Sequence, residues 1–151
     1  SKKPQSGTEA KLAPLKFKIF DQELTVDAPL GAKVEKKGEF PVIRQGKHFI
    51  MSIQPTLDSD LTDFKKQFTT QPEVIKLKKT LLDEPSALAY QVTMKAFKED
   101  VSVYMVVVSV GDKKFTCSDS SMEEINLKDK RSSKDIELLV KVAKSLKAAR
   151  T

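Results

Sequence analysis

The densest apolar stretch of the chain is "VSVYMVVVSV" at residues 101–110, and it limits the fold more than any other part of the sequence. Ser102 and Ser109 interrupt it, and it falls short of the roughly 20 apolar residues that a membrane-spanning helix needs. Gly111 and Asp112 follow immediately and are typical of a tight turn, after which "KKFTCS" begins another strand. We therefore expect a buried strand at residues 101–110, in the core of an antiparallel sheet.

Three earlier segments also show the patterns of antiparallel strands. The segment "LKFKIFDQELTV" alternates apolar residues with lysines, breaks at Asp21 and Gln22, and resumes, which predicts a hairpin with one buried face. The segment "PVIRQGKHFIMSI" predicts two strands around a turn at Gln45 and Gly46. The segment "EVIKLKKTLLDEPSALAYQVTMKAF" predicts two more strands, separated by the turn "DEPS".

Two segments have helical spacing instead. Leu61, Phe64 and Phe68 recur at i, i+3 and i+7, which predicts a short helix with one apolar stripe. A C-terminal helix is predicted to begin after a cap at Ser132 or Ser133 and to pack one face on the sheet. The apolar positions of that face are Ile136, Leu139, Val140, Ala143 and Leu146.

The chain opens with "SKKPQSGTEAKLAP", which is polar and has few large apolar side chains. Such a segment buries too little surface to offset the entropic cost of ordering it. We therefore expect residues 1–14 to be a flexible tether and residues 15–151 to form a single domain. The start at Ser1 without Met suggests either processing or an artificial boundary, and a linker of this composition is typical of the segment that follows the lipidated Cys of a bacterial lipoprotein. This predicts a membrane-tethered protein of the periplasm or another extracytoplasmic space, with a cytoplasmic location as the alternative.

The charge is basic, with 27 Lys and Arg against 21 Asp and Glu and a net charge of +6, which suggests nucleic acid or an anionic surface as a partner. Most of the basic residues are Lys and alternate with acids, as in "LKDKRSSKDIE", whereas phosphate-binding surfaces favour clustered Arg and stacking aromatics. The pattern therefore favours a mixed, solvated surface and disfavours nucleic acid. One candidate anion or partner surface precedes and enters the last helix, and its residues are Lys128, Lys130, Arg131 and Lys134.

The best candidate for a metal site is the acidic loop "CSDSSMEEINLKD", because hard cations such as calcium take carboxylate oxygens in loops. Its candidate ligands are Asp119, Glu123, Glu124 and Asp129. The loop lacks the alternating acidic order of an EF-hand, and lysines stand beside its acids, so a solvated loop is the alternative.

No residue set fits a catalytic centre. The only His, His48, has no identifiable orienting carboxylate or nucleophile in the sequence, and the only Cys, Cys117, is predicted to be a buried, inert thiol. The five Gly residues form no phosphate-binding fingerprint. The sequence therefore predicts a protein that is not an enzyme and needs no cofactor.

The end of the chain has a long hydrophobic strand, a turn, the "KKFTCS" strand and a terminal helix ending in "VAKSLKA". This succession resembles the C-terminal part of PsbP-like domains. The resemblance covers roughly residues 17–148 and is strongest over residues 101–148. The resemblance implies an α+β fold in which a central antiparallel β-sheet is flanked by helices as an α/β/α sandwich, with the C-terminal helix packed on the sheet. It also implies a binding or assembly role in a lumen or cell envelope, as in the lumenal PsbP proteins and the DcrB-like envelope proteins. It transfers no functional residue to this chain.

The leading expectation is therefore a non-catalytic binding or assembly module with a protein partner in the envelope, which contacts the membrane only through a lipid anchor before Ser1. Two alternatives from other classes stay open. One is a basic protein that binds nucleic acid or an anionic surface, and the other is an enzyme that uses His48 or the acidic loop.

Overall fold

The computed structural model describes residues 11–36, 39–46, 49–56, 66, 75–96, 99–119 and 132–149. The strands are β1 (Leu12–Ile19), β2 (Gln22–Pro29), β3 (Lys33–Lys36), β4 (Pro41–Gln45), β5 (Phe49–Pro55), β6 (Ile75–Glu84), β7 (Ala87–Ala96), β8 (Glu99–Val110), β9 (Lys113–Ser118) and β10 (Lys147–Ala148). Helix α2 spans Ser133–Lys144 and lies between β9 and β10 in the chain.

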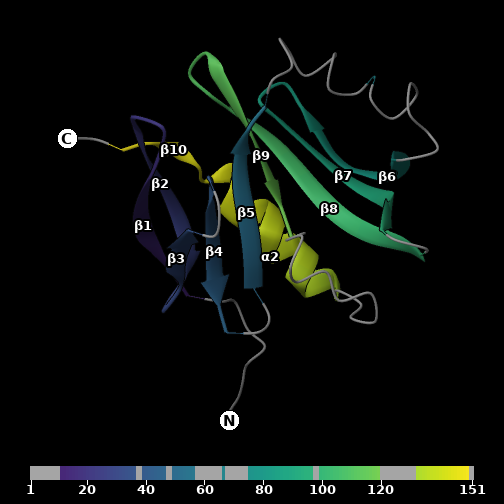
Figure 1. Ribbon diagram of the computed structural model, residues 1–151, viewed down its shortest axis with the longest axis horizontal. Coiled ribbons are helices and arrows are strands. Elements are labelled where there is room, and N and C mark those ends of the chain that lie inside the picture. The colour runs from purple at the N-terminus through teal and green to yellow at the C-terminus, as the bar shows by residue number, and fades with distance from the viewer. Residues whose placement is uncertain are drawn as a thin grey trace.

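These strands form two antiparallel sheets (Figure 1). The larger has seven strands in the order β3-β4-β5-β9-β8-β7-β6, and the smaller has three in the order β1-β2-β10. The long apolar stretch at residues 101–110 lies in β8, which is paired on both sides, with β7 and with β9. The expected central strand and its tight turn into β9 are therefore confirmed.

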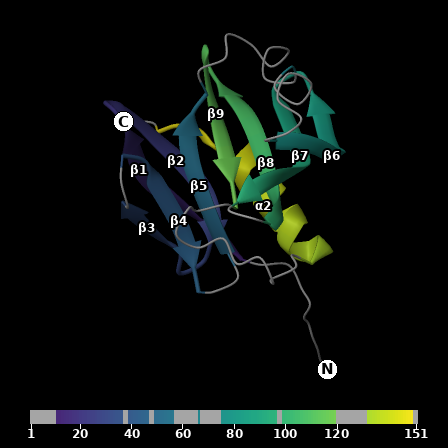
Figure 2. The same ribbon diagram turned by 45° about the vertical axis from the view of Figure 1, so that its right-hand side comes forward.

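The core lies between the larger sheet and a second layer that consists of the smaller sheet and α2. The inner face of β8 carries Tyr104, Val106 and Val108, which belong to one buried cluster with Leu139 and Val142 of α2. Leu24 and Val26 of β2 complete the same cluster from the smaller sheet. In Figure 2, α2 and the smaller sheet lie behind the same face of the larger sheet.

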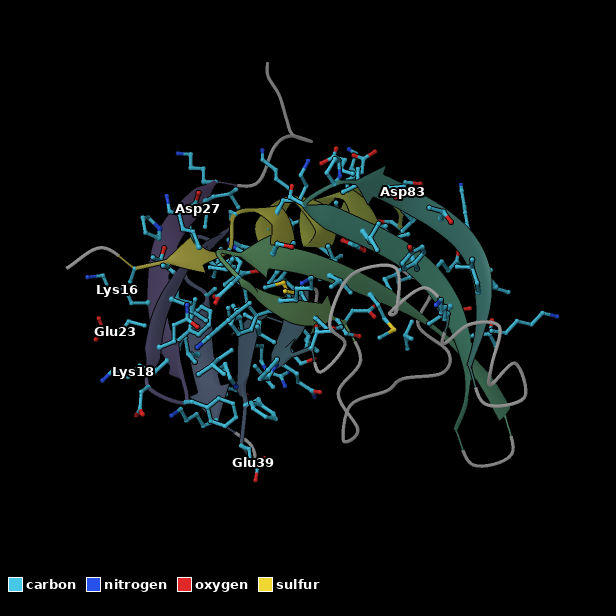
Figure 3. All side chains as sticks on the ribbon, turned by 90° about the horizontal axis from the view of Figure 1, so that it is seen from above. Lys16, Lys18, Glu23, Asp27, Glu39 and Asp83 are labelled. Atoms are coloured by element: carbon cyan, nitrogen blue, oxygen red, sulfur yellow. The ribbon has the colours of Figure 1, made fainter. Side chains whose placement is uncertain are left out.

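The smaller sheet is amphipathic in the way the sequence predicts. Lys16 and Lys18 alternate with buried Phe17 and Ile19 along β1, and Glu23 lies opposite Lys18 on β2. Figure 3 shows Lys16, Lys18 and Glu23 on the outer side of this sheet, away from α2. The predicted hairpin with one buried face is therefore confirmed.

Helix α2 is fixed at both ends by hydrogen bonds. At its start the Asp135 amide donates to Ser132 Oγ at 3.1 Å and the Ser132 amide donates to Asp135 Oδ2 at 3.2 Å, a reciprocal capping box. At its end Ser145 Oγ donates to the Val142 carbonyl at 2.6 Å and accepts from the Asp27 amide of β2 at 2.8 Å. The predicted C-terminal helix is confirmed, and its last turn is tied to the smaller sheet.

The expected α/β/α sandwich is wrong. The described part of the chain is mostly β, in two antiparallel sheets, and α2 covers one face of the larger sheet. The place beside α2 is taken by the smaller sheet, because the β1–β2 hairpin buries its apolar face there and Lys147–Ala148 adds β10 to β2. Of the segment predicted as the first helix, only Lys66 is described and it is helical, while Leu61, Phe64 and Phe68 lie outside the described residues.

The structure describes only the last residues of the predicted tether, residues 11–14. Residues 1–10 lie outside the described part of the chain, and β1 begins at Leu12, which pairs with Pro29 of β2. Residues 12–14 of the expected tether are therefore part of the smaller sheet.

Candidate functional site

A depression opens where the two sheets meet at one end of the molecule. It has a volume of about 660 Å³ and is bordered by the β1–β2 turn, the end of β5 and the β8–β9 turn. These three segments lie at the upper end of the molecule in Figure 1. The lining residues are Ile19, Phe20, Asp21, Gln22, Pro55, Thr56, Asp112, Lys113, Lys114 and Phe115.

The base of the depression is formed by buried, hydrogen-bonded strands. Ile19 and Phe115 are 3% and 2% exposed and belong to the main core. The Thr56 amide donates to the Lys114 carbonyl at 2.9 Å, and the hydroxyls of Thr56 and Thr116 lie 2.7 Å apart. These bonds continue the β5–β9 pairing to the edge of the depression, so its wall is part of the sheet framework.

Phe20 projects from the rim in an unusual backbone conformation. Ile19 pairs with Gln22, so Phe20 and Asp21 form the two-residue loop of the β1–β2 hairpin. Phe20 has a φ of 54°, and among the described residues it alone adopts a positive φ without being Gly. A bulky residue in the left-handed region costs about 1–3 kcal/mol, and such strain concentrates at binding and catalytic sites.

The ring of Phe20 is largely in solvent although the residue bears this cost. Phe20 is 76% exposed, the largest fraction among the exposed large hydrophobic residues of the described chain. Its only described aromatic neighbour is Phe40, which it meets edge to face with ring centroids 5.8 Å apart and an interplanar angle of 84°. The contact supports one side of the ring and leaves most of it open to a partner.

The rim carries both signs of charge. Asp21 comes from the β1–β2 turn, and Asp112, Lys113 and Lys114 come from the β8–β9 turn and the start of β9. The rim has two acidic and two basic side chains, and it surrounds an apolar floor. Such a rim is suited to a partner that itself carries charges of both signs. It is a poor match for a uniformly anionic backbone such as that of a nucleic acid.

The candidate metal ligands are only partly placed. Asp119 follows β9, and its Oδ1 accepts a hydrogen bond from the Tyr104 amide at 2.9 Å, while the Asp119 amide donates to the Tyr104 carbonyl at 3.3 Å. Asp119 thus completes the pairing of β8 and β9. Glu123, Glu124 and Asp129 lie outside the described residues, and the described parts of the chain hold no cluster of three or more His, Cys, Asp or Glu suited to a metal. The cation site stays a prediction.

The candidate anion surface is likewise only partly placed. Lys134 is exposed in the first turn of α2, whereas Lys128, Lys130 and Arg131 lie outside the described residues. Beside Lys134, the capping box already uses the Asp135 amide, and the Asp135 carboxylate already supplies negative charge at this helix end. The proposed anion surface stays a prediction.

The residues considered for catalysis do not converge. His48 lies outside the described residues. Cys117 is fully buried in β9, and burial raises the pKa of its thiol to about 12, so the predicted buried thiol is confirmed. Glu84 belongs to the predicted turn "DEPS" but is the last residue of β6, and it forms an ion pair with Lys144 of α2 at 3.1 Å.

Sequence reasoning missed the depression. It placed the break of the first hairpin at Asp21 and Gln22, but the turn is Phe20–Asp21, and nothing singled out Phe20. The available clue was a bulky residue at a two-residue hairpin loop, where Gly and Asn are typical. Pro55, Thr56 and Lys113 join Phe20 only through the meeting of the two sheets, which the local pattern does not show.

Comparison with known proteins gives no family for this chain: no protein-family model matches the sequence, and no curated protein is significantly similar to it. Within the described residues, no helix combines the length and the apolar character that are needed to cross a membrane.

Proposed function

We propose that this protein is a non-catalytic binding module and that the depression beside Phe20 is its partner site. The observation that carries the proposal is the conformation of Phe20, a strained and 76% exposed aromatic residue at the rim of a depression of about 660 Å³. Apart from its edge-to-face contact with Phe40, the ring buries little surface in the fold, although its backbone conformation is costly. Binding of the ring by a partner accounts for both features.

The chemistry of the lining favours binding over catalysis. The described residues that line the depression include no His, Cys, Ser or Tyr, and Thr56 is their single hydroxyl. That hydroxyl already shares a hydrogen bond with Thr116 at 2.7 Å. A nucleophile would need a base within hydrogen-bonding distance, but the Thr56 hydroxyl is shared with Thr116, and the ionisable lining residues Asp21, Asp112, Lys113 and Lys114 stand at the rim.

The partner that fits is a protein with an apolar side chain and nearby charges of both signs. Aromatic rings at the centre of an interface supply much of its binding energy, and a mixed polar rim supplies specificity. Phe20, the buried base at Ile19 and Phe115, and the rim charges reproduce that arrangement.

We place this partner in the cell envelope, in line with the resemblance to PsbP-like proteins and with the composition of the first residues. β1 starts at Leu12 and reaches the depression at Ile19, so at about 3.3 Å per residue the two points are roughly 23 Å apart. A tether joined before Leu12 would therefore hold the depression away from the membrane, toward a partner.

The test is site-specific photo-crosslinking in the cells that naturally produce the protein. A photoreactive phenylalanine analogue replaces Phe20 in one variant and Leu30 in a matched control, because Leu30 is 61% exposed and follows β2 at the other end of the same hairpin. We expect a discrete protein adduct from position 20 and none from position 30. No adduct from position 20, or the same adducts from both positions, would contradict the proposal.

A further inference from the structure

Strand β6 forms one edge of the seven-stranded sheet (Figure 1). Within the described residues its only strand neighbour is β7, and it is 10 residues long. Proteins usually keep edge strands short or cover them, because the outward backbone amides and carbonyls of an edge are a template for another strand. β6 is therefore a long potential pairing site.

The first half of β6 is open on both sides of the strand. Residues 76–80 are all exposed, although successive side chains point to opposite faces of a sheet. The second half differs, because Leu81 and Leu82 pack against the main core and Glu84 is held by Lys144. The anchored half fixes the position of the strand, while residues 76–80 have exposed side chains and no described strand pairs with their outer edge.

The charges of this open half select the kind of strand that can pair with it. Lys76, Lys78 and Lys79 stand within it, and Leu77, which is 37% exposed, lies between two of them. Register shifts of the β6–β7 ladder fall between Leu77 and Lys79 and between Thr80 and Leu82, so the edge is bent as well as charged. Three lysines oppose pairing with a second copy of the strand and favour an acidic one.

The opposite edge of the sheet is β3, a shorter strand that also carries exposed lysines. β3 has four residues, and its Glu35 is held by Arg44 of β4, with Oε1 of Glu35 3.1 Å from Nε of Arg44. Two lysines, Lys33 and Lys36, are exposed on this short edge. β3 thus offers a matched reference with the same lysine spacing as Lys76 and Lys79 but a much shorter strand.

We propose that β6 binds an acidic, extended segment of a partner protein, which adds to the larger sheet as a further strand. Backbone hydrogen bonds to residues 76–80 supply the pairing, and acidic side chains of the segment contact Lys76, Lys78 and Lys79. This site is separate from the depression beside Phe20 and does not depend on it.

The test uses a capped peptide of about ten residues in which Glu alternates with Val and Thr, long enough to span the open half of β6. Its binding is measured by NMR titration of the full chain, together with hydrogen exchange of the backbone amides. We expect binding with slower exchange at residues 76–80. The variant K76E/K79E should weaken binding by about tenfold or more, because two Lys–Glu pairs between β6 and the peptide become repulsive Glu–Glu pairs. The matched variant K33E/K36E should change it by less than about twofold.

Two further probes separate strand addition from simple charge attraction. The same peptide with alternate amides N-methylated keeps its charge but loses its backbone donors, and we expect it not to bind. A single-stranded oligonucleotide of equal charge should not slow exchange at residues 76–80. The proposal is overturned if the N-methylated peptide or the oligonucleotide binds as well as the parent peptide, if K76E/K79E and K33E/K36E weaken binding equally, or if the parent peptide does not bind.

Discussion

Two tight turns stand beside the depression and differ in one decisive residue. The β8–β9 turn is Gly111–Asp112, with a φ of 63° at Gly111, and the β1–β2 turn is Phe20–Asp21, with a φ of 54° at Phe20. Both are two-residue loops that begin with a residue of positive φ and continue with Asp. Gly adopts this conformation without steric cost and Phe does not. The folding of a hairpin explains Gly111, but it does not explain Phe20.

A side chain at Gly111 tests whether a positive φ is costly in these two turns. A Cβ added at Gly111 meets no atom within 4 Å, so the variant G111A carries only the cost of a left-handed backbone. We expect G111A to lower the free energy of unfolding by about 1–2 kcal/mol, measured by urea denaturation. An unchanged stability would show that this end of the molecule accepts positive φ without cost, and the case for strain at Phe20 would fail with it.

The contact between Phe20 and Phe40 is the next largest expected effect. Edge-to-face pairs of this kind contribute about 0.5–1.5 kcal/mol, and exposure of Phe20 places this pair at the lower end. A double-mutant cycle with F20A, F40A and F20A/F40A measures the coupling energy by denaturation. A coupling well above 1.5 kcal/mol would make Phe20 a structural residue that is held in place by its neighbour.

Cys117 reports whether these effects stay local. Its thiol is buried in β9 and its pKa is raised to about 12 by burial, so in the native state it remains protonated at neutral pH and reacts with a thiol reagent only after the strand opens. We expect G111A, in the turn that precedes β9, to speed the reaction of Cys117 with such a reagent severalfold. F20G, on the other hairpin, should leave the rate almost unchanged, and equal acceleration by both variants would contradict a local effect.

The pKa of Cys117 also predicts how stability depends on pH. Burial raises the pKa of the thiol from its ordinary value of 9.0 to about 12, so between these values the unfolded state loses a proton that the native state keeps. The stability that the protonated thiol of Cys117 contributes is therefore fully present below about pH 9 and is lost as pH rises toward 12. The stability of C117A should fall less steeply over this range than that of the parent protein. Equal slopes in denaturation at several pH values would show that Cys117 becomes accessible without unfolding.

Local patterns predicted the elements well, and the arrangement of the elements less well. The alternation along β1 and the apolar run of β8 each determine one strand and its buried face, so the hairpins and the turn at Gly111 were predictable. The separate smaller sheet was not, because it depends on the pairing of Lys147 with Thr25 across most of the chain. The depression was missed for the same reason, since residues from three distant turns and strand ends form it.

The most direct test of the account is the free energy of unfolding of F20G against that of the parent protein. Gly removes the strain at a positive φ and removes a ring that is mostly in solvent, so we predict that F20G is more stable by up to about 1 kcal/mol. Such a gain would show that the chain retains Phe20 at the expense of stability, as expected of a residue kept for binding. A loss of stability of about 1 kcal/mol or more would show that Phe20 serves the fold, and would contradict the assignment of this turn as the partner site.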